Sequence, residues 1–92
     1  MTQAVVRLAI RGRVQGVGYR WFLCDAARRL GVCGWVRNRR DGSVEAMAAG
    51  SREAIDELVA AAHRGPEAAV VESVEVSEGE GVFEGFEPRP TV

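Results

Sequence analysis

The sequence predicts an α+β protein in which two helices cover one face of a mostly antiparallel sheet of four to five strands. This prediction depends on two observations. Segments with alternating apolar residues and segments with apolar residues at helical spacing follow one another as strand, helix, strand, strand, helix, strand. The chain has 92 residues, which suffices for one core between two layers, so we expect residues 1–92 to form a single domain.

The first predicted strand and the first predicted helix flank a glycine-rich loop. Apolar residues alternate with arginine or alanine over residues 6–10, which is typical of a strand with one buried face. From Trp21 to Leu30 the apolar residues recur at helical spacing, and Gly31 is a suitable C-terminal stop. We therefore expect the loop, residues 12–20, to leave the end of a strand and to enter the start of a helix.

A hairpin and a second helix follow. Residues 32–38 and residues 43–48 have strand character, and the Asp-Gly pair between them is typical of a tight hairpin turn. These two strands should pair antiparallel. Ser51 is a good N-cap for the second helix, whose apolar stripe extends to Ala62.

The last part of the chain predicts a fourth strand and a short closing strand. Val70, Val74 and Val76 have the same parity, so we expect them on the inner face of the fourth strand. Two later phenylalanines favour a closing strand, and Pro88 confines it to an edge of the sheet or shortens it. This order of elements is that of a ferredoxin-like βαββαβ sandwich, a fold with many functions, so the function must be argued from the loop.

The loop over residues 12–20 has the composition of an anion-binding site. Its glycines permit positive φ and allow successive backbone N–H groups to converge on one point. The helix that follows adds free N–H groups and the positive end of its dipole. Arg20 is a cation at this unfavourable end, which is understandable if an anion lies beside it. The residues alone leave open a plain strand-to-helix turn with an exposed arginine.

Several other kinds of site do not fit the loop. The chain contains no lysine, so a Walker loop is excluded, and the dinucleotide pattern that begins at Gly16 and Gly18 fails at Trp21. The loop contains no cysteine and therefore no thiol nucleophile. No set of His, Cys and carboxylate residues has metal-ligand spacing, so we expect no metal and no other cofactor.

The charges of the chain are unevenly distributed. Residues 1–50 contain nine arginines and three acidic residues, whereas residues 51–92 contain three arginines and ten acidic residues. One half can therefore attract an anion without the polycationic character of a nucleic-acid-binding protein, and we expect no nucleic acid partner. The sequence has neither a signal-like start nor a stretch of membrane-spanning length, so we expect a cytoplasmic protein with no membrane partner. We also expect a monomer. Cys24 and Cys33 are then expected to be reduced packing residues.

Two segments of the chain resemble the signatures of the acylphosphatase family. The first segment is Gly12-Arg13-Val14-Gln15-Gly16-Val17-Gly18-Tyr19-Arg20. The second is Gly34-Trp35-Val36-Arg37-Asn38, followed after three residues by Gly42-Ser43-Val44 and after five more by Gly50. The resemblance covers the chain from about Val5 to Phe86 and implies the same ferredoxin-like fold. Tyr19 stands where the family more often has phenylalanine.

The resemblance implies an enzyme that hydrolyses acyl phosphates to a carboxylate and inorganic phosphate, the latter also acting as an inhibitor. Arg20 takes the position of the catalytic arginine that binds phosphate, and Asn38 that of the catalytic asparagine. An asparagine amide can orient a water but is too weak a base to deprotonate it. The phosphate-binding residues that the resemblance implies are Gln15, Gly16, Val17, Gly18, Tyr19 and Arg20.

Some alternatives stay open beside this interpretation. Asn38 could be a turn residue, and His63 could be a general base, although capping and the helix dipole explain its place near a helix end. A noncatalytic phosphate-sensing or regulatory module could share the loop. An RNA-binding domain of this fold would need spaced aromatic residues and a basic sheet face, which residues 44–48 do not provide. The remaining aromatic candidates are expected to pack or to form a wall of the site: Tyr19, Trp21 and Trp35.

Overall fold

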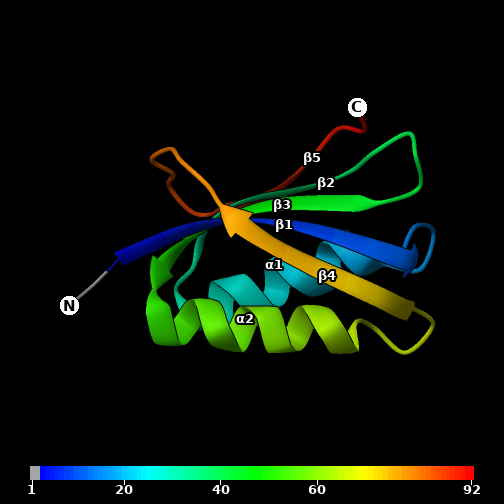
Figure 1. Cartoon of the computed structure of the whole chain (residues 1–92), viewed down its shortest axis with the longest axis horizontal. Coiled ribbons are helices and arrows are strands. Elements are labelled where there is room, and N and C mark those ends of the chain that lie inside the picture. The colour runs from blue at the N-terminus through cyan, green and yellow to red at the C-terminus, as the bar shows by residue number, and fades with distance from the viewer. Residues whose placement is uncertain (1–2) are drawn as a thin grey trace.

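A computed structural model, which describes residues 3–92, contains one five-stranded sheet with both helices on the same face (Figure 1). The elements are β1 (Gln3–Arg13), α1 (Tyr19–Leu30), β2 (Cys33–Asn38), β3 (Val44–Ser51), α2 (Arg52–Arg64), β4 (Val70–Glu78) and β5 (Phe86–Arg89). The strand order is β4-β1-β3-β2-β5, and all neighbours are antiparallel except β2 and β5. The predicted ferredoxin-like α+β fold is thereby confirmed.

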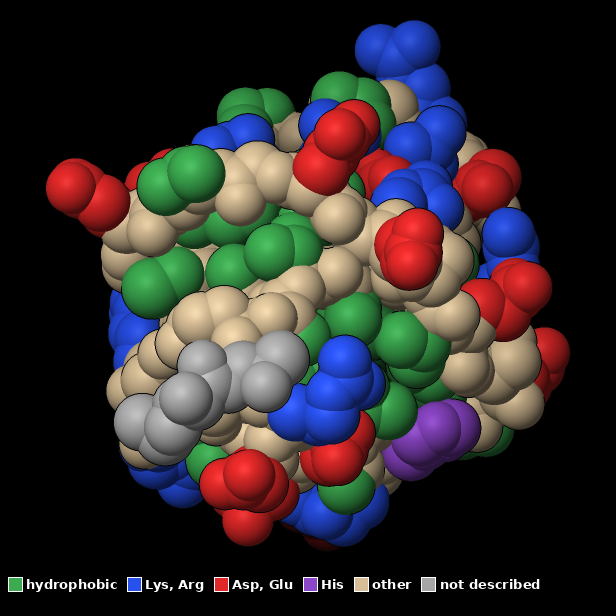
Figure 2. All heavy atoms as spheres, turned by 60° about the vertical axis from the view of Figure 1, so that its left-hand side comes forward, with side chains coloured by type: hydrophobic (Ala, Val, Ile, Leu, Met, Phe, Trp, Pro, Cys, Tyr) green, Lys and Arg blue, Asp and Glu red, His purple; other side chains and the backbone are tan. Residues whose placement is uncertain are grey.

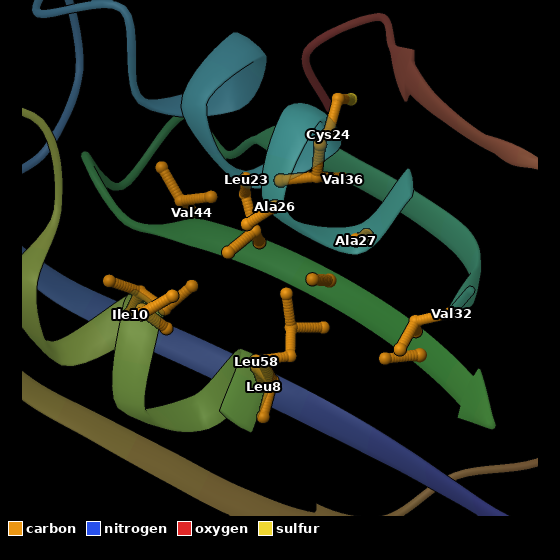
Figure 3. Packing of buried hydrophobic residues seen from close by; sticks show 14 of the residues in the cluster. Leu8, Ile10, Leu23, Cys24, Ala26, Ala27, Val32, Val36, Val44 and Leu58 are labelled. Atoms are coloured by element: carbon orange, nitrogen blue, oxygen red, sulfur yellow. The ribbon is translucent and has the colours of Figure 1, made fainter. Parts of the chain in front are cut away.

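The core lies between the sheet and the two helices (Figure 3). Alternate residues of the two central strands face this core, so that Leu8 and Ile10 of β1 are fully buried. Leu23 of α1 and Leu58 of α2 pack onto them and are also fully buried. Alanines such as Ala27 occupy several other helix positions that face the sheet, and their small size lets the helices approach the strands closely.

The structure confirms the predicted hairpin turn and the predicted N-cap. In the β2–β3 turn the Asp41 carboxylate accepts hydrogen bonds from the backbone N–H of Ser43, at 2.9 Å, and from its hydroxyl, at 2.6 Å. Ser51 Oγ accepts a hydrogen bond of 3.1 Å from the N–H of Ala54, which caps α2. The turn therefore has a defined geometry directly after Asn38, the last residue of β2.

The prediction for the inner face of the fourth strand is wrong in part. Val70 is 58% exposed, and its neighbour Val71 packs against the core together with Val74. Val76 pairs with the buried Leu8 and therefore lies on the inner face as predicted, but it is 49% exposed. The register with β1 shifts between Arg11 and Gly12, which leaves one extra residue in β4. Because this bulge changes the parity of the strand, Val71 and Val74, which are three positions apart, face the same side. The strand also lies at an edge of the sheet, so its side chains are less covered than those of β1.

The closing strand is short and lies at the opposite edge, as the sequence predicted. Phe86 is buried in the core, and Pro88 stands opposite Val36 on an edge strand, where a missing N–H is tolerated. The chain then continues along the β2–β3 turn. There the N–H of Val92 donates to the carbonyl of Asn38 at 3.2 Å, and the N–H of Arg40 donates to the carbonyl of Val92 at 2.8 Å. The C-terminal residues therefore lie beside the end of β2.

Candidate active site

The loop after β1 leads directly into the first turn of α1. The helix begins at Tyr19, two residues earlier than predicted, because Gly18 takes the left-handed conformation (φ 79°) and serves as its N-cap. Gly16 is also left-handed, with φ 72°. Arg20 consequently lies within the first turn, which contains no acidic residue. A cation therefore stands at the positive end of the helix dipole, the arrangement that an anion would stabilise.

The glycine that opens the first signature has a different role. Gly12 belongs to β1 and lies at the bulge opposite β4. A Cβ atom there would lie 2.2 Å from the carbonyl oxygen of Val70, so only glycine allows the two strands to approach this closely. By contrast, a Cβ at Gly16 or Gly18 would meet no atom within 4 Å. Gly12 thus shapes the strand that leads to the loop.

The loop, the start of α1 and the end of β2 enclose a small cavity of about 100 Å³. Asn38 reaches it because this residue has the same parity as Gly34 and Val36, which are buried on the side of the sheet that carries the helices. The structure therefore brings together Arg20 and Asn38, which lie 18 positions apart in the chain. The lining residues are Val14, Gly16, Gly18, Tyr19, Arg20, Trp21 and Asn38. Gln15 and Val17, which the sequence also assigned to phosphate binding, are not among them.

The guanidinium of Arg20 is attached to the C-terminal strand. Its Nη1 donates a hydrogen bond of 3.3 Å to the backbone carbonyl of Arg89. A guanidinium has five N–H donors in a planar fork, so this bond fixes one side of the group and leaves other donors for an anion. This contact could not be predicted from the sequence, because any residue type supplies a backbone carbonyl.

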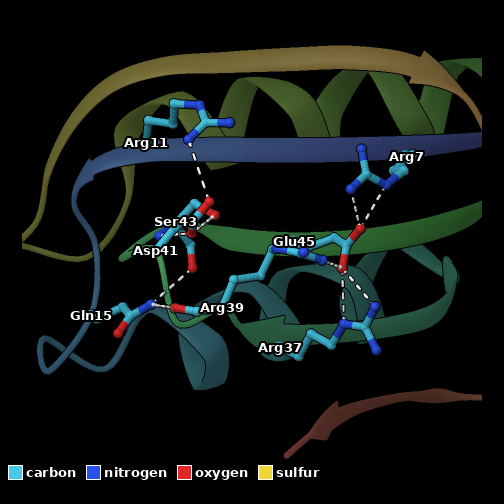
Figure 4. Close-up of polar contacts among 8 residues, drawn as sticks. All are labelled: Arg7, Arg11, Gln15, Arg37, Arg39, Asp41, Ser43 and Glu45. Atoms are coloured by element: carbon cyan, nitrogen blue, oxygen red, sulfur yellow. Dashed lines mark hydrogen bonds and ion pairs between the residues drawn. The ribbon is translucent and has the colours of Figure 1, made fainter. Parts of the chain in front are cut away.

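The side chain of Gln15 connects the loop to the β2–β3 turn (Figure 4). Its Nε2 donates to the carbonyl of Arg39 at 2.7 Å and to the carbonyl of Ser43 at 2.9 Å. The turn begins immediately after Asn38. Gln15 therefore links the segment that carries Arg20 to the segment that carries Asn38, a role that sequence reasoning missed.

The three aromatic candidates have different surroundings. Tyr19 is buried, and its hydroxyl donates to the carbonyl of Ala62 at 2.7 Å, so the polar group that distinguishes it from phenylalanine has a partner in α2. Burial raises the pKa of this hydroxyl well above its usual value. Trp35 packs on the open face of the sheet beneath the guanidiniums of Arg37 and Arg89, at 4.5 and 5.2 Å from the ring centroid. Trp21, by contrast, is 64% exposed and forms a wall of the cavity.

A buried carboxylate supports the same turn from the open face of the sheet (Figure 4). Glu45 of β3 is only 4% exposed, and it accepts hydrogen bonds from three arginines. Arg7 bonds one of its carboxylate oxygens, whereas Arg37 (2.8 Å) and Arg39 (3.0 Å) both bond the other. Burial alone would raise the pKa of Glu45, but the bonds from the guanidiniums outweigh it and hold this pKa below its usual value.

This cluster of Arg7, Arg37, Arg39 and Glu45 has two consequences. Arg37 and Arg39 flank Asn38 in the sequence, so Glu45 fixes the backbone on both sides of the candidate catalytic residue. The open face of the sheet is also more basic than residues 44–48 alone indicated.

The remaining candidates lie elsewhere. His63 is exposed in the last turn of α2, outside the lining of the cavity. Cys24 is buried in the core, where burial raises the pKa of its thiol, and Cys33 is partly buried; both are free thiols. Within residues 3–92 there is no group of three or more His, Cys, Asp or Glu residues placed to hold a metal ion. No helix in this described range is both long and apolar enough to cross a membrane.

Larger hollows on the surface are lined by neither Arg20 nor Asn38. A groove of about 330 Å³ runs between α1 and α2. A hollow of about 530 Å³, lined in part by Cys33 and Phe83, lies at the other end of the sheet, the end that Figure 2 brings forward. We take the smaller cavity as the candidate site because it joins the arginine, the asparagine and the glycine loop.

Residues 6–88 of the chain match the family model Acylphosphatase. The chain belongs to the acylphosphatase family. A protein named Acylphosphatase from Acidovorax sp. (strain JS42) is 57% identical over 86 residues, which are 92% of this chain and 89% of that protein. Another from Cupriavidus necator is 53% identical over the full length of both chains. The predictions of the family and of a hydrolase are thereby confirmed.

Solved structures of this family have the same fold. The acylphosphatase from Bacillus subtilis is similar with a TM-score of 0.89 and 33% identity, and the match covers 96% of this chain and 99% of that one. The acylphosphatase from Coxiella burnetii gives a TM-score of 0.91 and 32% identity, over 95% of this chain and 93% of that one.

Proposed function

We propose that the protein hydrolyses the carboxyl-phosphate bond of small acyl phosphates by direct attack of water on phosphorus. The water oxygen forms a bond to phosphorus while the bond between phosphorus and the carboxylate oxygen breaks, and the products are a carboxylate and inorganic phosphate. One proton of the attacking water passes to a phosphate oxygen. A carboxylate is a good leaving group, so the reaction requires little help from a general acid.

The observation that carries this proposal is the joint presence of Arg20, Asn38 and two left-handed glycines around one cavity at the start of α1. Arg20 supplies a charge-assisted fork for the phosphoryl oxygens, and the loop amides of residues 15–20 add further donors together with the helix dipole. These groups stabilise negative charge without reorganisation during the reaction. Removing one such donor in an enzyme site typically lowers the rate by about 100- to 1,000-fold.

Asn38 acts by orienting the water. Its side chain belongs to a paired strand end, and the neighbouring residues Arg37 and Arg39 are held by Glu45. A fixed amide can accept a hydrogen bond from the water and donate another to it or to the phosphate. Holding the two reactants in line is a large part of catalysis when the leaving group is already good.

We further propose that the protein acts as a cytoplasmic monomer and that inorganic phosphate competes with the substrate. The product occupies the place of the phosphoryl group, and Arg20 and the loop amides would bind it in the same way. Arginine and backbone donors supply the charge stabilisation for which many phosphate-transferring enzymes use a metal ion.

The test is a direct assay of the purified protein with acetyl phosphate, with phenyl phosphate as the matched substrate that has a poor leaving group. We expect phosphate release from acetyl phosphate well above the spontaneous rate and little from phenyl phosphate. Isothermal titration with inorganic phosphate tests the alternative of a noncatalytic phosphate-sensing module. A protein that binds phosphate but hydrolyses neither compound would be a phosphate-sensing module, and the proposed activity would be wrong.

A further inference from the structure

Trp21 is an exposed aromatic side chain at the edge of the candidate site. It is 64% exposed, and it lines the cavity together with Arg20 and Asn38. The other large apolar side chains that are exposed in the described part of the chain are all valines. The second tryptophan, Trp35, is 7% exposed, so the fold does bury an indole where it uses one for packing. An exposed indole beside a cavity provides apolar surface that a ligand can cover.

The cavity is small, with a volume of about 100 Å³, and it is open to solvent on one side. Arg20 and Asn38 line it, so the phosphoryl group of a bound acyl phosphate would lie inside it. The acyl part of the substrate would then extend toward the open side, beside the exposed indole of Trp21.

We propose that Trp21 forms an acyl subsite, which favours acyl phosphates whose acyl group is uncharged and flat or apolar over those with a small acyl group. This inference rests on the proposed function. Trp21 follows Arg20 directly in the first turn of α1, so the helix backbone that presents the arginine to the phosphoryl group also presents the indole beside it. An acyl group that covers the indole removes apolar surface of both partners from water.

The charged groups next to Trp21 offer no free partner to a charged acyl group. Asp25 lies four residues after Trp21, which places the two side chains next to each other on the helix surface. The Asp25 carboxylate pairs with Arg29 at 3.2 Å, so the two charges offset each other. An acyl group with a second carboxylate would gain no unpaired cation from this pair, whereas a phenyl ring requires none.

The experiment compares kcat/KM for benzoyl phosphate and acetyl phosphate, corrected for spontaneous hydrolysis, in the wild type and three variants. Trp21→Ala removes the proposed subsite, and Trp21→Phe keeps an aromatic ring. Val82→Ala is the matched control, because Val82 is 98% exposed on the β4–β5 connection and does not line the site. Thermal unfolding midpoints verify that each variant is folded.

We expect Trp21→Ala to lower kcat/KM for benzoyl phosphate about 3- to 10-fold more than it lowers kcat/KM for acetyl phosphate, with the difference mainly in KM. Trp21→Phe should retain most of the preference, and Val82→Ala should change neither substrate. An equal loss on both substrates, or no loss on either, would overturn the subsite. A wild type that hydrolyses neither compound refutes the proposed function and this inference with it, whereas normal hydrolysis without a selective loss refutes this inference alone.

Discussion

Replacing Gln15 tests whether the loop and the β2–β3 turn must be held together for catalysis. In Gln15→Ala two partly buried hydrogen bonds are lost, those from Nε2 to the carbonyls of Arg39 and Ser43. Each carbonyl keeps one other bond, since Arg39 O also accepts from the N–H of Gly42 and Ser43 O from the N–H of Arg39. No carbonyl is left without a partner, so we expect the free energy of unfolding to fall by about 1 to 2 kcal/mol, the net value of two ordinary bonds.

Gln15→Glu is the sharper change because it keeps the shape of the side chain and reverses its hydrogen-bonding character. At neutral pH the introduced carboxylate can only accept, and it would face the same two carbonyl oxygens. We therefore expect this variant to be less stable than Gln15→Ala, by about 1 kcal/mol or more. The carbonyls and partial burial raise the pKa of the introduced carboxyl, and below that pKa it can donate one bond. The difference in stability between Gln15→Glu and Gln15→Ala should therefore decrease as the pH falls.

Urea unfolding at several pH values measures the stability of both variants, and steady-state kinetics with acetyl phosphate measures the effect on the site. We expect kcat to fall by about 10-fold or more, since a displacement of roughly 1 Å between reacting groups can cost about 100-fold in rate. The inhibition constant for phosphate should change much less, because Arg20 and the start of α1 remain. If Gln15→Glu is as stable as Gln15→Ala at pH 7 and both keep the wild-type kcat, the link between the segments has no catalytic role.

Arg20→Gln should abolish turnover and weaken phosphate binding. The fold should stay intact or become slightly more stable, because a cation is removed from the positive end of α1. Steady-state kinetics, phosphate titration and unfolding measure these effects, and a wild-type rate would refute the role of Arg20. Asn38→Ala should lower kcat by about 100-fold or more with little change in phosphate affinity, and a proportional loss of both would make Asn38 a binding or structural residue. Glu45→Gln should lower stability by about 2 kcal/mol at neutral pH. The folded state lowers the pKa of Glu45, so the ionised carboxylate contributes fully to the free energy of unfolding above its ordinary pKa of 4.5. This contribution is lost as the pH falls through the lowered pKa. The melting points of the wild type and of Glu45→Gln should therefore converge in acid. A chelator should leave the rate unchanged; a loss that a divalent cation restores would contradict the proposed role of Arg20.

The periodicity of the sequence predicted the fold well because the inner faces of most elements have a regular period. Leu8 and Ile10 alternate with exposed residues, and the stripe of the first helix includes the buried Leu23. The inner face of β4 could not be predicted in this way. One extra residue opposite Arg11 and Gly12 shifts the parity, and such a bulge depends on how two strands pair rather than on the residues of one strand.

The candidate site, like the fold, could be predicted from the sequence only in part. The glycine loop and the family signatures identified Arg20 and Asn38, and the structure brings both to one cavity. The contacts that hold them were not visible in the sequence. The partner of Arg20 is a backbone carbonyl of β5, and the partners of Gln15 are two carbonyls of the turn. Carbonyls are present at every residue, so only the fold determines which of them are close enough to matter.

The contacts around Asn38 explain how a neutral amide could suffice for the proposed reaction. Three separate segments attach to the residues on either side of it. Glu45 bonds the guanidiniums of its two neighbours, Gln15 bonds the carbonyl of Arg39, and Val92 donates to the carbonyl of Asn38 itself. An amide cannot activate water by removing its proton, so its value lies in holding the water in line with the phosphorus. That value depends on how firmly the amide itself is held, and most of the groups that hold it lie outside the cavity.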